Sequence, residues 1–178
     1  PRLVMATQDP IQRIDREVVS DEPVNLGFKP EHVEVIKQGL IGVAKEGTSA
    51  RIFVGAPYQS AGKTGTAQAV TIGQKEKYNA SKMEEHQRDH ALYMAFAPAD
   101  NPQIALAIVV ENAGFGAAQA APIARRVFDY WLLGDYPSVE DIEASQKGVA
   151  STPIGTRRRK EDIQLVPSEG VTRLMGKR

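Results

Sequence analysis

The chain has 178 residues, of which 42% are hydrophobic and 25% charged, as in an ordinary single globular domain. Its 22 basic and 22 acidic residues cancel, which argues against a protein whose main partner is nucleic acid or an anionic membrane. The absence of cysteine excludes a disulfide scaffold, a thiolate metal site and a cysteine nucleophile. No apolar stretch approaches the roughly 18 residues of a membrane-spanning helix.

The first 28 residues are predicted to form short extended segments separated by turns. Residues 3–5 and 11–14 carry the aliphatic side chains that favour strands. The dipeptides Asp-Pro at 9–10 and Glu-Pro at 22–23 are typical of turns. We therefore expect two short strands here.

A helix is predicted over residues 30–46. Pro30 suits the first helical position, and Glu31 adds a negative charge to the first turn. Apolar residues recur at three- and four-residue spacing, which places them on one face. They are Val33, Ile36, Leu40 and Val43. Gly47 is a typical residue at which such a helix ends.

The second half of the chain contains a predicted hairpin. Residues 92–98 and 104–110 are apolar runs joined by a strong turn signal at 99–102, and a polar connection over 73–89 precedes them. Since the run 104–110 is almost entirely apolar, we expect it to be buried on both faces, in the middle of a covered sheet.

A second helix is predicted over residues 117–133, ending at Gly134. The side chains expected to face the core are Ile123, Val127, Tyr130 and Trp131, and those expected on its flank are Arg125, Arg126 and Asp129. The order of elements predicts an α/β fold of the α+β type, in which helices pack on the faces of an antiparallel sheet. Residues 1–136 would form this domain, and the polar residues 137–178 a disordered tail.

The most informative segment is Gly62-Lys63-Thr64-Gly65-Thr66. A phosphate-binding loop would require a glycine at position 57, where the chain has Pro57, and a helix directly after the motif. Residues 61–72 are instead rich in Gly and Thr and favour a strand. The segment is therefore interpreted as a strand motif.

The residues of such a strand are suited to binding a carboxylate and an extended peptide. Thr64 and Thr66 point to the same face because side chains alternate, so two hydroxyls could bind one carboxylate. Lys63 adds a positive field, and Gly65 permits close approach to the backbone. The exposed edge of the strand could also pair with an extended peptide. Lys-Thr-Gly is the strand motif of serine enzymes that recognise penicillin.

Several short segments accompany the motif in a characteristic order. They are Gly62-Lys63-Thr64-Gly65-Thr66-Ala67-Gln68, Tyr78-Asn79-Ala80, Arg88-Asp89-His90-Ala91, Phe96-Ala97-Pro98, Asn101-Pro102, Val109-Val110-Glu111-Asn112 and Leu132-Leu133-Gly134-Asp135. This order resembles the C-terminal part of the transpeptidase domain of class B penicillin-binding proteins, and most of all their elongation-specific type. The resemblance covers residues 1–136, and it implies a fold of the penicillin-binding protein and serine β-lactamase type.

The resemblance implies a peptidoglycan D,D-transpeptidase. In this family a serine attacks a D-Ala-D-Ala stem peptide, and an amine of a neighbouring stem then takes the acyl group. β-Lactams acylate the same serine, and no cofactor is needed. The resemblance also implies a place at the periplasmic face of the bacterial inner membrane, with the anchor outside this chain, and a membrane glycosyltransferase of the elongation machinery as partner.

The resemblance also assigns roles to the motif residues. Thr64 and Thr66, with Gly65 between them, would bind the carboxylate of the substrate or drug. The backbone N–H of Thr66 would help to form the oxyanion hole, and Lys63 would support the electrostatics.

The nucleophile motif of the family, Ser-x-x-Lys, fits only Ser60-Ala61-Gly62-Lys63, which overlaps the strand motif. A true nucleophile begins a helix, and Gly62 with its β-like surroundings argues against one here, so Ser60 is interpreted as a coincidence. The second family motif, Ser-x-Asn, does not occur. We therefore expect this chain to be inactive alone, and the upstream part of its own domain to carry the nucleophile.

The remaining candidate residues have simpler interpretations. His32, His86 and His90 lack the rigid spacing of a metal site, so no metal is predicted. His90 beside Asp89 predicts a hydrogen bond where a strand begins. The basic run 157–160 predicts a solvated tail, and residues 114–116 are expected near the rim of the cleft.

Two alternatives to a transpeptidase stay open. One is a β-lactamase or carboxypeptidase of the same superfamily. The other is a non-catalytic module on the same fold that senses β-lactams or serves as a scaffold.

Overall fold

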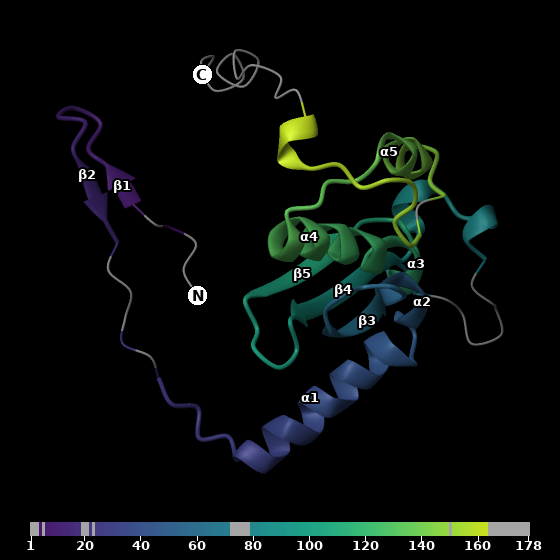
Figure 1. Ribbon diagram of the computed structural model, residues 1–178, viewed down its shortest axis with the longest axis horizontal. Helices are drawn as coiled ribbons and strands as arrows, with labels where there is room; N and C mark the ends of the chain where they lie inside the picture. Colours follow the sequence, from purple (N-terminus) through teal and green to yellow (C-terminus); the bar gives the residue numbers. More distant parts are fainter. Residues whose placement is uncertain are drawn as a thin grey trace. The chain divides into compact units, whose positions relative to one another are not determined.

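The computed structural model describes residues 4, 6–18, 22, 24–71, 79–149 and 151–163 (Figure 1). The chain divides into two compact units, Pro1–Val33 and Glu34–Arg178. The sequence instead predicted a boundary at residue 136. The structure differs because residues within the described ranges 137–149 and 151–163 pack against the rest of the second unit.

The first unit contains an antiparallel hairpin of β1 (Ala6–Gln8) and β2 (Asp15–Glu17). The carboxylate of Asp9 accepts the N–H groups of Ile11 and Gln12, each at 2.8 Å, so residues 11–14 lie in the connection between the strands. The strand predicted there is wrong because this Asx turn takes its place. Of the predicted segment 3–5, residues 3 and 5 lie outside the described residues, and Val4 lies outside a strand.

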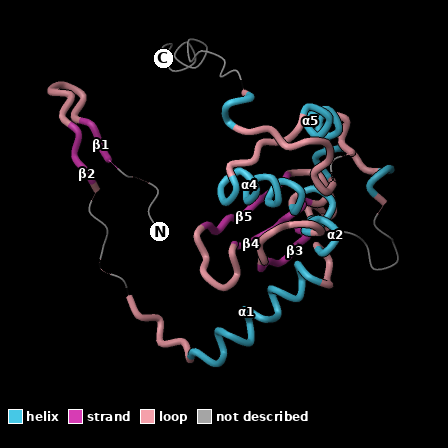
Figure 2. The backbone as a smooth tube through the Cα atoms, in the orientation of Figure 1, coloured by secondary structure: helices cyan, strands magenta, loops and turns pink. Residues whose placement is uncertain are grey.

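The second unit contains a three-stranded antiparallel sheet in the order β3-β4-β5 (Figure 2). Its strands are β3 (Ala61–Ala67), β4 (His90–Ala97) and β5 (Ile104–Val110). The helices are α1 (Pro30–Lys45), α2 (Ala50–Phe53), α3 (Gly116–Gln119), α4 (Ala121–Leu133) and α5 (Val139–Gln146), with short 3-10 helices η1 (Ala80–Lys82), η2 (Glu85–Gln87) and η3 (Lys160–Asp162). The predicted antiparallel α+β class is confirmed.

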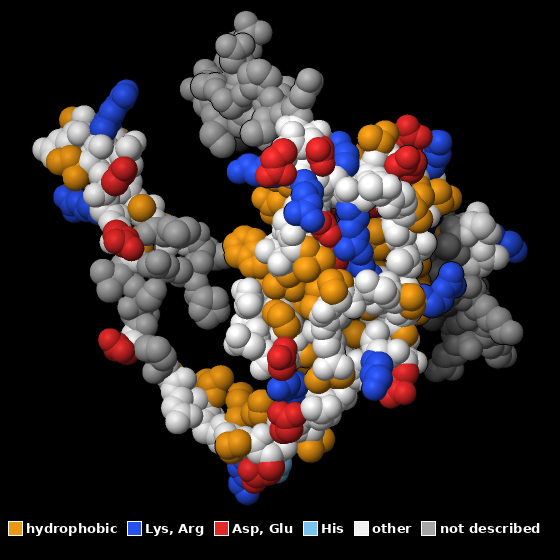
Figure 3. All heavy atoms as spheres, viewed as in Figure 1, with side chains coloured by type: hydrophobic (Ala, Val, Ile, Leu, Met, Phe, Trp, Pro, Cys, Tyr) orange, Lys and Arg blue, Asp and Glu red, His pale blue; other side chains and the backbone are white. Residues whose placement is uncertain are grey.

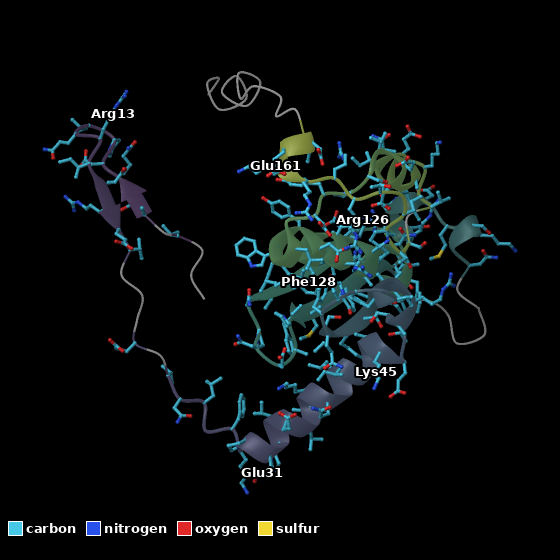
Figure 4. The ribbon with its side chains drawn as sticks, viewed as in Figure 1. Arg13, Glu31, Lys45, Arg126, Phe128 and Glu161 are labelled. Carbon is cyan, nitrogen blue, oxygen red and sulfur yellow. The ribbon has the colours of Figure 1, made fainter. Side chains whose placement is uncertain are left out.

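The main core lies between β4 and the helices α2, α3 and α4. The ring of Phe53 lies 6.3 Å from the rings of both Tyr93 and Phe128, measured between centroids. Figure 4 shows Phe128 pointing from α4 toward the sheet. The rest of this core is built largely from alanines, whose small side chains let the helices lie close to the strands. They are Ala91, Ala95, Ala97, Ala120, Ala121 and Ala124.

The buried face of α4 is not the predicted one. The four side chains expected in the core are exposed to 37% or more: Ile123, Val127, Tyr130 and Trp131. The buried residues instead include Ala124, Arg125, Phe128 and Asp129. The buried face combines alanines and Phe128 with the mutually paired Arg125 and Asp129, so the charged pair is buried while larger apolar side chains stay exposed.

Strand β5 is also less buried than predicted. Its side chains alternate between half-buried and exposed, and Val109 is 61% exposed. β5 pairs with β4 along one edge and with no other strand in the described part of the chain. The expectation that the run 104–110 is buried on both faces is therefore wrong for these residues, because only the alternate side chains on one face are partly covered and those on the other face are exposed.

A buried arginine on α4 holds the end of α2. Arg125, expected on the flank of its helix, is only 1% exposed. Its Nη1 donates to the carbonyl oxygens of Ile52 and Val54, both at 3.0 Å, and its Nε donates to the carboxylate of Asp129 at 2.9 Å. Tyr58 donates its hydroxyl to the same carboxylate at 2.7 Å. Every charge of the pair thus has a partner, as burial requires.

The pKa of Tyr58 is raised, first by burial and then by the hydrogen bond to Asp129. The phenol therefore keeps its proton at every physiological pH and remains a donor to the carboxylate.

Replacing this arginine by a side chain of similar volume tests its role. Arg125→Met removes the cationic partner of the buried Asp129 carboxylate, which keeps the Tyr58 hydrogen bond, and the guanidinium donor of two carbonyl groups, so we expect the free energy of unfolding to fall by about 3 kcal/mol. Urea denaturation measures the change. Arg51→Met removes an exposed arginine and serves as control, with a change within about 0.5 kcal/mol. Equal effects of the two variants would contradict the role of Arg125.

The segment after residue 136 is ordered as far as the structure describes it. The sequence predicted a tail without structure, but residues 139–146 form α5, and Tyr136 and Arg158 form an antiparallel bridge with hydrogen bonds of 2.8 and 3.0 Å. Ser138 caps α5 by accepting the N–H of Asp141 at 2.9 Å. The remaining predicted tail, residues 164–178, lies outside the described residues.

An ion pair attaches this segment to α4. Arg126 Nε donates to Asp141 Oδ2 at 2.8 Å, its Nη2 donates to the other carboxylate oxygen, and Asp141 is 1% exposed. Figure 4 shows Arg126 on the side of α4 that faces α5. The basic run 157–160 was expected to be solvated. Its first residue, Arg157, instead donates to the carboxylate of Asp135 at 2.8 Å. The polar composition suggested disorder, whereas these charges find partners on α4 and beside it.

Removing Asp141 tests this attachment. Asp141→Ala deprives Arg126 of its bidentate partner, and we expect trypsin to cleave after Lys147 about ten times faster, because local opening becomes easier. Limited proteolysis followed by mass spectrometry gives the rate. Glu143→Ala, which removes an exposed carboxylate of the same helix, is expected to leave the rate unchanged. Faster cleavage in both variants would contradict the proposed anchor.

Candidate substrate-binding strand

The motif Lys63-Thr64-Gly65-Thr66 lies on β3, as predicted, although the strand ends at Ala67. β3 pairs with β4 along one edge, with Gly65 opposite Leu92. Its other edge pairs with no strand in the part of the chain that the structure describes. Backbone N–H and C=O groups of alternate residues point to an edge, so β3 presents an open row of donors and acceptors.

The two motif threonines differ in exposure. Thr66 is exposed, whereas Thr64 is only 7% exposed. The sequence predicted that both hydroxyls lie on one face, and the alternation of the strand agrees with this. The burial of Thr64 was not foreseen. Lys63 is exposed, and its Nζ donates to the carbonyl oxygen of Thr64 at 2.7 Å. Its positive charge therefore lies beside the backbone of the motif.

Sequence reasoning missed Thr48, which contacts the motif directly. Its Oγ1 lies 2.8 Å from Oγ1 of Thr64, within a hydrogen bond in which either hydroxyl can donate. Thr48 lies in the turn that follows the end of α1 at Lys45, sixteen residues before Thr64. No local pattern signals this contact, because only the packing of the helix end against the sheet brings the two residues together.

The next residue, Ser49, fixes the chain beside Thr48. Its hydroxyl donates to the carbonyl oxygen of Val43 at 3.1 Å and lies 3.0 Å from the hydroxyl of Tyr93, which stands opposite Thr64 on β4. Ser49 is fully buried, and burial raises the pKa of Tyr93. The phenol therefore stays protonated and remains able to donate, and the turn after α1 is tied to the strand beside the motif.

A glycine on α3 lies directly over the backbone of the motif. A Cβ placed on Gly116 would lie 2.3 Å from the Leu92 carbonyl oxygen and 2.5 Å from that of Gly65. No side chain larger than hydrogen fits between helix and strand at this point. Residues 114–116, expected near the rim, thus support the motif strand.

His90 holds the segment that leads to this glycine. Its Nδ1 accepts the N–H of Asn112 at 3.0 Å, and the carbonyl oxygen of Asp89 accepts the N–H of Gly114 at 2.8 Å. The predicted hydrogen bond at the strand entry is confirmed. It also assigns the tautomer, because a ring nitrogen that accepts carries no proton.

Ser60 lies immediately before β3 and is 3% exposed. It begins no helix, and Lys63 lies on the strand, so these residues lack the helical arrangement of a Ser-x-x-Lys nucleophile. Among the described residues, no group of three or more histidine or acidic side chains is arranged to hold a metal ion. No helix in the same residues is long and apolar enough to cross a membrane.

The sequence matches the family model of the penicillin-binding protein transpeptidase domain over residues 1–129. The chain belongs to this family. The Lys-Thr-Gly strand and the helices that support it therefore lie within the matched part, whereas α5 and the segment after it follow that part.

Curated relatives agree with this assignment. The peptidoglycan D,D-transpeptidase MrdA of Haemophilus influenzae is 43% identical over 109 residues, which are 60% of this chain and 17% of that protein. MrdA of Escherichia coli K12 is 37% identical over 153 residues, 85% of this chain and 24% of the relative. The chain thus spans no more than about a quarter of the length of these proteins.

Solved structures share the fold. PBP2 of Pseudomonas aeruginosa matches with a TM-score of 0.53 and 34% identity over 66% of this chain and 24% of that one. Penicillin-binding protein A of Mycobacterium tuberculosis, solved as a penicillin G acyl-enzyme complex, matches with a TM-score of 0.51 and 28% identity over 74% of this chain and 27% of that one.

Substitution of the supporting glycine tests the packing of α3 on the motif. Gly116→Ala forces the helix away from the Gly65 backbone, and we expect the free energy of unfolding to fall by about 2 kcal/mol. Thermal denaturation gives the change. Gly39→Ala, on α1 with no atom within 4 Å of its added methyl group, is the matched control and is expected to be neutral or slightly stabilising. Similar melting points for the two variants would overturn this account.

Proposed function

We propose that this chain is the part of a peptidoglycan D,D-transpeptidase that carries the Lys-Thr-Gly strand, in an enzyme of the elongation-specific class B type. The observation that carries the proposal is the position of Lys63–Thr66 on an open sheet edge, within a transpeptidase domain match. The MrdA relatives, named as D,D-transpeptidases, support the reaction.

In the proposed reaction, a serine oxygen attacks the carbonyl carbon of the D-Ala-D-Ala bond and D-alanine leaves. An amine of a neighbouring stem peptide then attacks the acyl-serine and releases the enzyme. The extended peptide would pair with the open edge of β3. Thr66, which is exposed, would donate its hydroxyl to the terminal carboxylate, and Lys63 would favour that negative charge.

The Thr66 backbone N–H would stabilise the oxyanion that forms during both attacks. Such a donor acts through its fixed position, since it needs no reorganisation as the charge develops. The close contact between Gly116 and Gly65 supports this role, because it holds the strand next to Thr66 in place.

The nucleophile would lie elsewhere in the complete protein. Ser60 is unsuitable because it is buried and precedes a strand. Two surfaces that have no partner among the described residues support a further part of the domain. They are the outer edge of β5 and the exposed apolar face of α4, with Ile123, Val127 and Trp131. Figure 3 shows hydrophobic side chains gathered over α4 and β5. On this proposal the upstream part of the domain covers these surfaces.

The biological setting follows from the proposed reaction. The substrates would be peptidoglycan stem peptides, the inhibitors β-lactams, and the place the periplasmic face of the inner membrane. A membrane glycosyltransferase that supplies glycan strands would be the partner enzyme.

Mass spectrometry of the complete protein after incubation with benzylpenicillin tests the proposal. We expect one penicilloyl adduct, on a serine outside this chain, and none on the 178-residue chain alone. Ser60→Ala is expected to leave the rate of adduct formation unchanged within about twofold. An adduct on Ser60, or no adduct on the complete protein, would contradict the proposal and favour the sensing or scaffold alternative.

A second variant tests the role assigned to Thr66. Thr66→Val removes the hydroxyl and keeps the shape, and we expect acylation of the complete protein by benzylpenicillin to slow at least tenfold, since hydrogen bonds to charged groups contribute about 1.5–3 kcal/mol. Stopped-flow or quenched acylation kinetics give the rate constant. Thr156→Val, at an exposed position in the segment after α5, is the control. An unchanged rate in Thr66→Val would refute carboxylate binding by this side chain.

A further inference from the structure

Thr48 lies outside the Lys-Thr-Gly motif and contacts it. We infer that Thr48 is a positioning residue that orients the Thr64 hydroxyl for the carboxylate of the substrate. The inference rests on the proposed function, because it concerns how the same strand recognises that carboxylate. It follows from the direct hydroxyl pair, at 2.8 Å, between a residue at the end of α1 and the buried motif threonine.

The direction of this hydrogen bond determines what Thr64 can do. A hydroxyl has one proton to donate and can accept through its lone pairs. If Thr64 donates to Thr48, its proton is occupied and its oxygen repels a carboxylate. If Thr48 donates to Thr64, the proton of Thr64 is available to the substrate. A bound anion favours the second arrangement, in which two aligned hydroxyls polarise one another.

The burial of Thr64 makes such orientation necessary. With 7% of the residue exposed, its hydroxyl has little access to water that could replace a missing partner. Thr66 differs, because its exposed hydroxyl can turn freely toward a ligand. Thr48 is exposed as well, so its own hydroxyl has solvent as a second partner. The two motif threonines therefore need different support, and the buried one receives it from the side chain of Thr48.

The surroundings fix the distance between Thr48 and Thr64. Ser49, next to Thr48, bonds to Tyr93, and Tyr93 stands opposite Thr64 in the ladder of β3 and β4. Ser49 and Tyr93 are both buried to 99% or more, so this second pair is shielded from water. Two neighbouring links thus join the turn after α1 to the sheet, one to the motif strand β3 and one to its partner β4. The buried Ser49–Tyr93 pair fixes the position of the turn that carries Thr48, and the Thr48 hydroxyl orients the hydroxyl of Thr64.

Acylation kinetics of the complete protein by benzylpenicillin test the inference. In Thr48→Val the hydroxyl is lost at nearly constant volume, and we expect the second-order acylation rate to fall about five- to tenfold. The change should appear in the concentration needed for half-maximal rate, more than in the limiting rate. Thr48→Ser keeps the hydroxyl and should restore the rate to within about twofold. Thr156→Val is again the control.

A double-mutant cycle separates orientation from a structural effect. In a Thr64→Val background, Thr48→Val should change the acylation rate less than twofold, because the hydroxyl that it orients is absent. A benzylpenicillin ester, which lacks the anionic carboxylate, should react equally with wild type and Thr48→Val. Thermal denaturation of each variant reports on folding, and Thr48→Ala replaces Thr48→Val if the latter melts early.

The outcomes distinguish the inference from the proposed function. If the wild-type protein is acylated and Thr48→Val matches it, Thr48 has no positioning role while the proposed function stands. The same holds if Thr48→Val slows acylation equally in the presence and absence of the Thr64 hydroxyl. If the complete wild-type protein is not acylated, both the proposed function and this inference fail.

Discussion

The buried guanidinium of Arg125 joins α4 to the end of α2, the short helix that follows the residues in contact with the candidate site. It holds the carbonyl groups at the end of α2 and is itself held by Asp129 on the following turn of α4. α2 begins directly after Thr48 and Ser49, the residues that contact β3 and β4. The turn that contacts the Thr64 hydroxyl is therefore linked through α2 to a buried charge on α4. An arginine suits this position because its planar group serves two carbonyls and a carboxylate at once.

Close packing provides the second constraint. The alanines of β4, α3 and α4 and the glycine at 116 allow the helices to lie against the strands without large intervening side chains. The motif strand thus has a rigid layer behind it and an open edge beside it. This combination suits recognition of an extended peptide, since the edge supplies hydrogen bonds while the layer keeps the donors in place.

The chain presents the site and at the same time leaves surfaces uncovered. The apolar outer face of α4 and the free edge of β5 lie in the described part of the second unit, together with the open edge of β3. Open sheet edges and exposed apolar helix faces are places where further chain can pack. They fit the proposal that this chain, which spans no more than about a quarter of the length of its curated relatives, supplies one wall of a larger active site.

The sequence by itself determined the elements and the family. The spacing of Val33, Ile36 and Leu40 predicted α1, and the apolar run 104–110 predicted β5, because the periodicity of helices and strands is local. The Lys-Thr-Gly motif with its accompanying segments indicated the transpeptidase family, which the family match confirms. The residues Lys63, Thr64, Gly65 and Thr66 were found in the same way, and their roles stay predictions.

Only the tertiary structure decided which faces are buried and which hydroxyls meet. Apolar residues lie on more than one side of α4, so periodicity could not choose between Trp131 and Phe128, and the buried face also holds the Arg125–Asp129 pair, which the sequence placed on the flank. The polar segment after residue 136 gave no apolar pattern, yet Arg126 and Asp141 attach it through paired charges. The contact of Thr48 with Thr64 joins residues sixteen positions apart along the chain. It exists because the turn after α1 packs against the strand β3.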